Sequence, residues 1–267
     1  QASGGGATAR RTPVRAAATR ALPPARPRRA AHPTTAALRR FERLHLPVYC
    51  GGPRRYVAFT FDDGPGVYTR LAVRVLHRFH VPATFFLVGR NLRPWRGALR
   101  AETRAGELGD HTWTHPYLPA LARRAIAAQL ADTKRAIARL TGRRVALFRP
   151  PYGARDGAVD AAARRLGLIE VLWNVDSADS LGASYAQIVR NVRAGLHPGA
   201  IVLMHENRGQ TIRALRYYIL PALHRSHLQP VTVARMLALD PPSLAQLSAG
   251  ANGCRGSGRG VGLLRNG

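Results

Sequence analysis

The stretch Tyr56-Val57-Ala58-Phe59-Thr60-Phe61-Asp62-Asp63-Gly64-Pro65 carries the strongest structural signal in this 267-residue chain. Its first six residues are apolar, β-branched or aromatic, and a Gly-Pro turn follows the two aspartates, so a buried strand is predicted over 56–61. Two adjacent carboxylates at the end of such a strand are costly, because like charges a few ångströms apart resist joint ionisation. A bound metal ion would remove this cost, since one carboxylate can bind the ion while the other stays free to take a proton.

Two histidines spaced by four residues, His111 and His115, supply the further ligands that such a site needs. A His-x3-His pair alone is more often structural or exposed, but with Asp63 it gives three nitrogen and oxygen ligands. Three such ligands leave one position open for water, which is typical of a catalytic zinc site. We therefore expect a divalent metal at Asp63, His111 and His115. Zinc is the first choice, and cobalt, iron, manganese and nickel stay open because mixed N/O sites accept them.

Strand-like and helix-like stretches alternate along the middle of the chain. The apolar, strand-like runs are 56–61, 83–88, 145–148, 168–174 and 200–204. The helix-like stretches are 69–80, 96–106, 121–140, 156–166, 184–195 and 211–226. This order predicts an α/β fold with a parallel sheet, open or closed. Because polar residues such as Asp62, Arg149, Asp176 and His205 follow the strand-like runs, the pattern favours a (β/α) barrel with its site at the carboxyl ends of the strands.

The chain is strongly basic, with 41 Lys+Arg against 14 Asp+Glu and a formal net charge of +27. Such a charge is the electrostatic footprint of a nucleic-acid-binding protein. However, the basic residues are spread throughout, all but Lys134 are arginine, and no nucleic-acid-binding motif accompanies them. We expect no specific nucleic-acid partner, and an anionic cell wall would attract the chain at least as well.

Three segments are expected from composition. Residues 1–47 are rich in Ala, Arg and Pro and predict a disordered basic tail or linker, while 48–240 predict one catalytic domain. Residues 241–267 begin with Pro241-Pro242, end rich in Gly and Arg, and predict a flexible C-terminal tail. A monomer is expected.

The two cysteines, Cys50 and Cys254, flank the region that carries the motifs. They would either join the ends of the domain in an oxidising compartment or be two unrelated thiols, and the sequence favours neither. No run of about 18 apolar residues suggests a membrane span. No signal-peptide pattern is visible, so a secreted or wall-associated location is an expectation drawn from function alone.

Four motifs in order resemble the polysaccharide deacetylases, the NodB-homology family also called carbohydrate esterase family 4. The resemblance covers residues 55 to 237, and its motifs are Thr60-Phe61-Asp62-Asp63-Gly64-Pro65, His111-Thr112-Trp113-Thr114-His115, Arg149-Pro150-Pro151-Tyr152-Gly153 and Leu203-Met204-His205. It implies a distorted (β/α) barrel of TIM-like, NodB-homology type. It also implies metal-dependent removal of N- or O-acetyl groups from carbohydrate polymers.

The resemblance also assigns catalytic roles. Asp62 would be the general base that activates water, and Arg149 would keep Asp62 ionised and oriented. His205 would be the general acid that protonates the leaving group, because the pKa of histidine lies near neutrality. Asp179 would hold His205 in its protonated form, with Asp176 the weaker candidate for this role.

Substrate contacts follow from the same resemblance. Tyr152 would offer its backbone N–H to the developing oxyanion, and Leu203 would line the acetyl pocket. The chain departs from the family where Ser180 stands in place of a tryptophan that walls this pocket. Trp173 or Trp113 would then have to supply that wall, and Trp173 is the expected one.

The expected function is therefore hydrolysis of acetyl groups on a carbohydrate polymer, with N-acetylglucosamine of peptidoglycan or chitin-type oligomers first. An acetylxylan esterase of the same family is an alternative. A catalytically weak carbohydrate-binding protein on the same fold is another, because Ser180 replaces the usual tryptophan.

Overall fold

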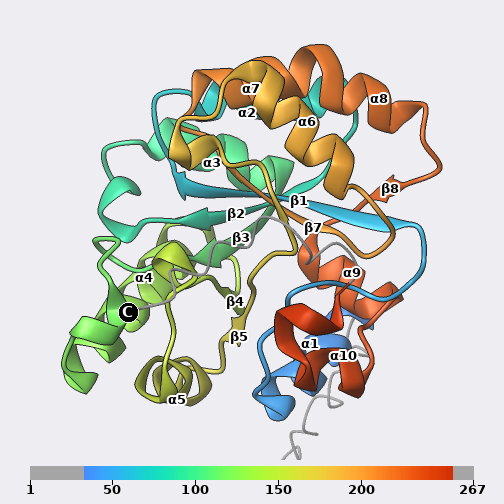
Figure 1. Ribbon diagram of the computed structural model, residues 1–267. Coiled ribbons are helices and arrows are strands. Elements are labelled where there is room, and N and C mark those ends of the chain that lie inside the picture. Colours follow the sequence, from blue (N-terminus) through green and yellow to red (C-terminus); the bar gives the residue numbers. More distant parts are fainter. Residues whose placement is uncertain (1–32, 255–267) are drawn as a thin grey trace, which may run out of the picture. The chain divides into compact units, whose positions relative to one another are not determined.

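The computed structural model describes residues 33–254. Its parallel strands form one sheet in the order β5-β4-β3-β2-β1-β7-β6, with β8 paired to the start of β1. The strands are β1 (Tyr56–Gly64), β2 (Ala83–Leu87), β3 (Gly106–Asp110), β4 (Leu147–Phe148), β5 (Ile169–Glu170), β6 (Val175–Asp176), β7 (Ile201–His205) and β8 (Gln229–Pro230). The sheet curls towards a barrel (Figure 1). Strands β5 and β6 stand at the two ends of its strand order.

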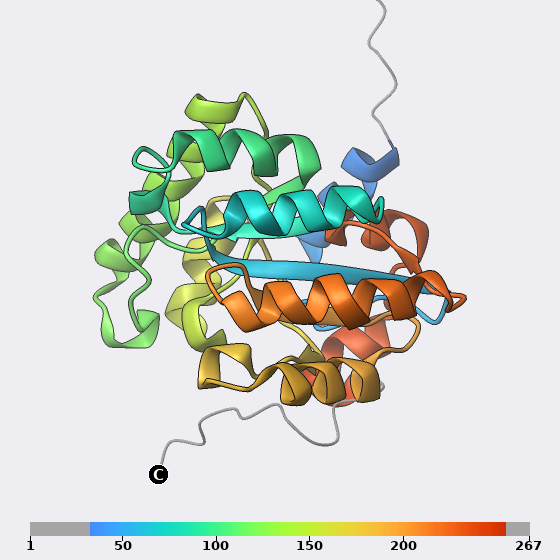
Figure 2. The same ribbon diagram turned by 90° about the horizontal axis from the view of Figure 1, so that it is seen from above.

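Helices connect all successive strands except β5 and β6, and the expected (β/α) barrel is confirmed. They are α2 (Thr69–Arg78), α3 (Arg96–Ala105), α4 (Arg123–Thr141), α5 (Gly157–Arg165), α6 (Tyr185–Gly195), α7 (Gly209–Ala214) and α8 (Leu220–His224). Seen from above, α2 and the α7–α8 segment run along either side of β1 (Figure 2). Gly142 ends α4 in the left-handed conformation (φ 68°), as its place after the apolar pattern predicts.

The two faces of each central strand have different partners. On β1, Phe59 and Phe61 are fully buried in the core that packs beneath the helices. Thr60 and Asp62 alternate with them and therefore face the barrel interior. Burying a phenylalanine contributes about 1.5–3 kcal/mol, so the outer face holds the strand in place and leaves the inner face for polar groups.

Two expected elements differ from the structure, and one strand of the structure was not expected. The run 168–174 forms no single strand: it contains β5, and β6 lies just beyond it, at opposite ends of the sheet order. The helix expected over 211–226 is broken into α7, a π-helical turn (Leu215–Ile219) and α8. Strand β3 was not expected at all, because Gly106-Glu107-Leu108-Gly109-Asp110 has little apolar character. Its pairing with all five residues of β2 makes it a strand.

Both expected tails contain ordered structure among the described residues. Helix α1 (Pro33–Leu44) packs on α9 (Val233–Leu239), and its Leu38 and Phe41 are buried with the inner face of the sheet. Helix α10 (Leu244–Ser248) follows α9. Helices α1 and α10 thus lie in stretches that were expected to be tails, while residues 1–32 and 255–267 lie outside the described part.

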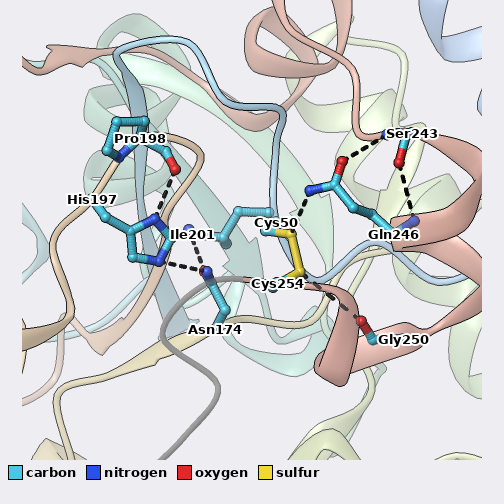
Figure 3. The surroundings of a disulfide bond; sticks show 9 residues. All are labelled: Cys50, Asn174, His197, Pro198, Ile201, Ser243, Gln246, Gly250 and Cys254. Atoms are coloured by element: carbon cyan, nitrogen blue, oxygen red, sulfur yellow. Dashed lines mark hydrogen bonds between the residues drawn. A yellow bond between two sulfur atoms is a disulfide. The ribbon is translucent and has the colours of Figure 1, made fainter.

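A disulfide joins Cys50 to Cys254, so the first of the two interpretations of these cysteines is the one the structure shows (Figure 3). It connects the segment before β1 to the end of the described chain, across 204 residues of sequence. Gln246 of α10 lies beside the sulfur of Cys50. The bond thus fastens the α10 segment to the sheet.

Replacing both cysteines by serine should lower the free energy of unfolding by about 2–5 kcal/mol, because a cross-link over a long loop restricts the unfolded chain. Denaturant titration with and without reductant measures the effect. The reductant should lower the free energy of unfolding of the wild type and leave that of the double variant unchanged. Equal stability of the oxidised wild type and the variant would contradict this prediction.

Two buried glutamates meet where α3 crosses the ends of β1 and β7. Glu102 and Glu206 are inaccessible to solvent, and a Cβ built on Gly64 would lie 2.6 Å and 1.5 Å from their respective Oε1 atoms. A side chain at position 64 would therefore displace these two carboxyl groups. Burial, then the facing carboxyl of Glu206, raises the pKa of Glu102 well above its usual value. Burial raises the pKa of Glu206 to about 7.

This pair should make the protein less stable as pH rises. Because the folded pair keeps protons that the unfolded chain loses near pH 4.5, its contribution is full below that pH and is lost as pH rises through about 7. Glu102→Gln keeps a hydrogen-bonding side chain but removes one charge, so it should flatten this decline. Urea unfolding at several pH values measures the slope, with Glu42→Gln as the matched control. A slope equal to that of the wild type would show that Glu102 does not cause the decline.

Candidate active site

The aspartate pair lies at an irregular end of β1. Asp62 is 3% exposed and pairs in register with His205 of β7, whereas the register with β2 shifts between Asp62 and Gly64. Asp63 has a φ of 72°, the left-handed conformation. This bulge breaks the strand alternation, so two consecutive carboxylates can both serve one site. The side chain of Asn91 donates to the backbone carbonyl of Asp63 at 3.1 Å and braces the bulge.

The three residues expected to hold a metal come together. One ligand atom from each of Asp63, His111 and His115 lies within 4.8 Å of the others. The Nε2 atom of His115 is 3.4 Å from Oδ1 of Asp63, and that of His111 is 3.8 Å from the same oxygen. His111 Nδ1 lies 2.7 Å from the carbonyl oxygen of Arg149. Since a carbonyl only accepts, Nδ1 carries the proton and Nε2 keeps its lone pair for a ligand bond.

The electrostatics of the cluster suit a cation. Burial alone would raise the pKa of Asp63, but the imidazoles of His111, His205 and His115 hold it below its usual value. Burial, then the neighbouring His111, lowers the pKa of His115. A carboxylate and two imidazoles are the donor set of a zinc-type site, so the residues present fit such an ion.

The loop that carries both histidines is pinned by side chains that sequence reasoning missed. Gln129 of α4 accepts hydrogen bonds from the backbone N–H groups of Trp113 and Thr114, each at 2.9 Å. The hydroxyl of Thr112 accepts from the N–H of His115 at 3.0 Å. Gln129 is one polar residue on a long helix, and no sequence signal distinguishes it.

Arg149 is fully buried in the barrel interior. Its Nη1 donates to Oδ1 of Asp62 at 2.8 Å and to the hydroxyl of Thr60 at 2.7 Å. Its Nε and Nη2 donate to the carbonyls of Val171 and Leu172. Burial lowers the pKa of Arg149, and the charge of Asp62 opposes that shift. The remaining oxygen of Asp62, Oδ2, lies 3.6 Å from Nε2 of His111 and so faces the metal-ligand cluster.

His205 ends β7 and is held by Asp179. Its Nδ1 lies 2.7 Å from Oδ1 of Asp179, and its backbone N–H donates to Oδ2 of the same carboxylate at 2.7 Å. Burial alone would lower the pKa of His205, but Asp179 raises it to about 9. Asp176 instead accepts hydrogen bonds from Trp173 and the backbone of Ala178. Of the two aspartates considered, Asp179 is thus the one bonded to His205.

The three residues expected to contact substrate lie around these groups. The ring of Tyr152 is 61% exposed and meets the ring of His115 edge-on, with centroids 4.8 Å apart. Leu203 is buried on the same face of β7 as His205. Trp173 is half-buried, its indole N–H donates to Asp176, and its ring lies 5.5 Å from the guanidinium carbon of Arg149. Gly153 (φ 67°) leaves room for this ring, because a Cβ there would lie 3.0 Å from it.

The departure at position 180 lies on the surface. Ser180 is exposed in a short 3₁₀ turn (Asp179–Leu181), and the neighbouring Leu181 is 85% exposed. Asp179 in the same turn is buried and faces His205. The serine therefore changes the rim of the site and leaves the Asp179–His205 pair in place.

Strained backbone concentrates in the loops of this edge. Among the described residues other than glycine, φ is positive at Asp63, Thr112, His115, Tyr152 and Ala178, and elsewhere only at His45 and His80. Each such residue costs of order 1–3 kcal/mol and persists only where its surroundings enforce it. Such strain clusters at functional sites, which agrees with the position of these loops.

Comparisons with known proteins identify relatives of this chain. The family model described as polysaccharide deacetylase matches residues 51–171. A chitooligosaccharide deacetylase from Sinorhizobium fredii is 36% identical over 190 residues, covering 65% of this chain and 87% of that protein.

Two further relatives are a longer deacetylase and a pseudoenzyme of known structure. The peptidoglycan-N-acetylglucosamine deacetylase PgdA of Listeria monocytogenes is 35% identical over 161 residues, covering 60% of this chain, and the match spans only 34% of that protein's length. The crystal structure of BA3943, a carbohydrate esterase family 4 pseudoenzyme from Bacillus anthracis, matches with a TM-score of 0.68 at 30% identity, covering 72% of this chain and 68% of that one. From its sequence motifs, its fold and these matches, the chain belongs to the polysaccharide deacetylase family.

Proposed function

We propose that this protein is a divalent-metal-dependent hydrolase that removes acetyl groups from N-acetylglucosamine in peptidoglycan or chitin-type oligomers. The observation that carries the proposal is that three groups of side chains meet at one edge of the sheet. They are the Asp63–His111–His115 cluster, the Asp62–Arg149 pair and the Asp179–His205 pair. The S. fredii and L. monocytogenes relatives, named for chitooligosaccharide and peptidoglycan deacetylation, support the substrate class.

Asp63, His111 and His115 would hold the metal, zinc first among the candidates. When bound there, the ion would polarise the acetyl carbonyl and make water more acidic. Asp62 would accept the proton of the attacking water at Oδ2, since Arg149 already occupies Oδ1. The backbone N–H of Tyr152 would donate to the developing oxyanion, with Leu203 and Trp173 lining the acetyl pocket.

His205 would then protonate the leaving nitrogen at Nε2, because its Nδ1 is bonded to Asp179. A pKa of about 9 keeps this imidazole protonated at neutral pH, as a general acid requires. Cleavage of the amide bond thus uses Asp62 as the proton acceptor and His205 as the proton donor.

The location that fits this function is outside the cytoplasm, in a secreted or wall-associated form. The Cys50–Cys254 disulfide supports it, because such bonds persist in oxidising compartments. No helix among residues 33–254 is long and apolar enough to cross a membrane. A monomeric state and the lack of a specific nucleic-acid partner stay predictions.

Acetate release from chitooligosaccharides, peptidoglycan and acetylxylan, with and without a chelator, tests the proposal. We expect release from the first two substrates, its loss on chelation and its recovery when zinc or cobalt is added. Asp62→Asn should retain the metal by elemental analysis yet release acetate roughly 10²–10⁴-fold more slowly, because it removes the general base. Release that survives thorough metal removal would disprove metal dependence.

The second candidate function is carbohydrate binding with weak or no catalysis. The structural likeness to the B. anthracis pseudoenzyme favours it. It predicts that the protein binds polymer but releases no acetate at any metal loading. The same screen, combined with pull-down on insoluble chitin and peptidoglycan, separates the two functions. Highest release from acetylxylan would instead favour the esterase alternative.

Asp179→Asn should shift the pH dependence of the reaction. The carboxylate of Asp179 raises the pKa of His205, so its removal should lower that pKa and move the alkaline limb of the rate profile to lower pH. The rate constant kcat should fall at every pH, and the fall should be larger above neutrality. An alkaline limb that stays in place would show that His205 is not the group responsible for it.

A further inference from the structure

Thr211 belongs to the same polar chain as Asp179 and His205. It is fully buried on α7, six residues after His205. Its hydroxyl donates to Oδ2 of Asp179 at 2.5 Å, although the two residues are 32 positions apart in sequence. The segment from the end of β7 into α7 therefore contacts Asp179 at both of its ends.

A threonine inside a helix can bond to a carbonyl of its own helix, and this chain shows that arrangement elsewhere. The hydroxyls of Thr103, Thr133 and Thr141 donate to the backbone carbonyl four residues earlier. Thr211 instead directs its hydroxyl to a carboxylate on another element. Thr211 therefore bonds to the carboxylate of Asp179 and not to a carbonyl of its own helix.

The contact fixes how the carboxylate of Asp179 is turned. Oδ2 accepts from two donors, the His205 backbone and the Thr211 hydroxyl, while Oδ1 meets the His205 ring at Nδ1. With both donors on Oδ2, rotation about the Cβ–Cγ bond would break two hydrogen bonds. Without the hydroxyl, one donor remains and Oδ1 is less firmly aligned with Nδ1.

We infer that Thr211 is a positioning residue, whose hydroxyl aligns Asp179 so that His205 presents Nε2 to the leaving group. This inference rests on the proposed function, because the leaving group belongs to that reaction. The hydrogen-bond geometry that it requires can be tested separately from activity.

The decisive comparison is Thr211→Val, which removes the hydroxyl, against Thr211→Ser, which keeps it. With the substrate that gives the fastest acetate release, we expect Thr211→Val to lower kcat by about tenfold or more, as for loss of a hydrogen bond to a charged group. KM should change little, and Thr211→Ser should stay close to the wild type. Thr103→Val, which removes a hydroxyl bonded within its own helix, is the matched control and should leave kcat unchanged.

A second readout does not require turnover. In ¹H–¹⁵N spectra at fixed pH, the Nδ1–H of His205 should give a downfield, slowly exchanging signal, assigned by its loss in Asp179→Ala. This signal should weaken or move upfield in Thr211→Val and persist in Thr211→Ser. Thr211→Ala against Thr211→Ser, which differ only in the hydroxyl, replaces the valine comparison if Thr211→Val does not fold.

The outcomes separate this inference from the proposed function. If the wild type releases no acetate but the His205 signal depends on the hydroxyl, the function fails and the alignment stands. If the signal and kcat of Thr211→Val match the wild type, the alignment is refuted. Equal impairment of the serine and valine variants would overturn it too, because it would show that Thr211 acts through packing.

Discussion

The buried ion pair between Arg149 and Asp62 is the interaction on which the site depends. A guanidinium without solvent access is tolerated only when its charge and its donors are satisfied, and removing one partner of such a pair costs about 3–5 kcal/mol. Arg149 meets this requirement by donating to Asp62 and Thr60 of β1 and to the carbonyls of Val171 and Leu172. Its own carbonyl faces Nδ1 of His111. One residue thereby links the end of β4, the end of β1 and the histidine loop.

The division of the aspartate pair follows from this linkage. Asp62 is turned inward by strand alternation and has one oxygen occupied by Arg149, whereas Asp63 lies on a bulge beside two imidazoles. The two carboxylates are adjacent in sequence but have different surroundings. Their different proposed roles need no other explanation.

The fold and much of the site could be predicted from sequence because their signals are local. Strand β1 has a continuous apolar run, and the connecting helices have apolar periodicity with clear ends such as Gly142. Strand β3 could not be predicted, because its residues become a strand only through pairing with β2. Helix α1 could not be predicted for a related reason. Its few apolar residues, Leu38 and Phe41 among them, become buried only because α9 packs against them in the fold.

The same limit applies to the supporting side chains of the site. Asp63, His111, His115 and His205 belong to motifs with recognisable spacing, whereas Gln129 and Thr211 are single polar residues on helices. Their importance arises from contacts made across the fold, at 15 and 32 residues of separation. Spacing within a short stretch holds no information about such contacts.

The left-handed residues around the site affect whether its loops could be moved to another protein scaffold. Asp63, Thr112, His115, Tyr152 and Ala178 adopt conformations that an isolated peptide of the same sequence would mostly abandon. The loops of the candidate site therefore do not determine their own conformation, and the same segments grafted onto another scaffold would relax. Glycine at these positions would relieve the strain but would also increase the conformational freedom of each loop. The loops keep their conformation because the surrounding barrel enforces it.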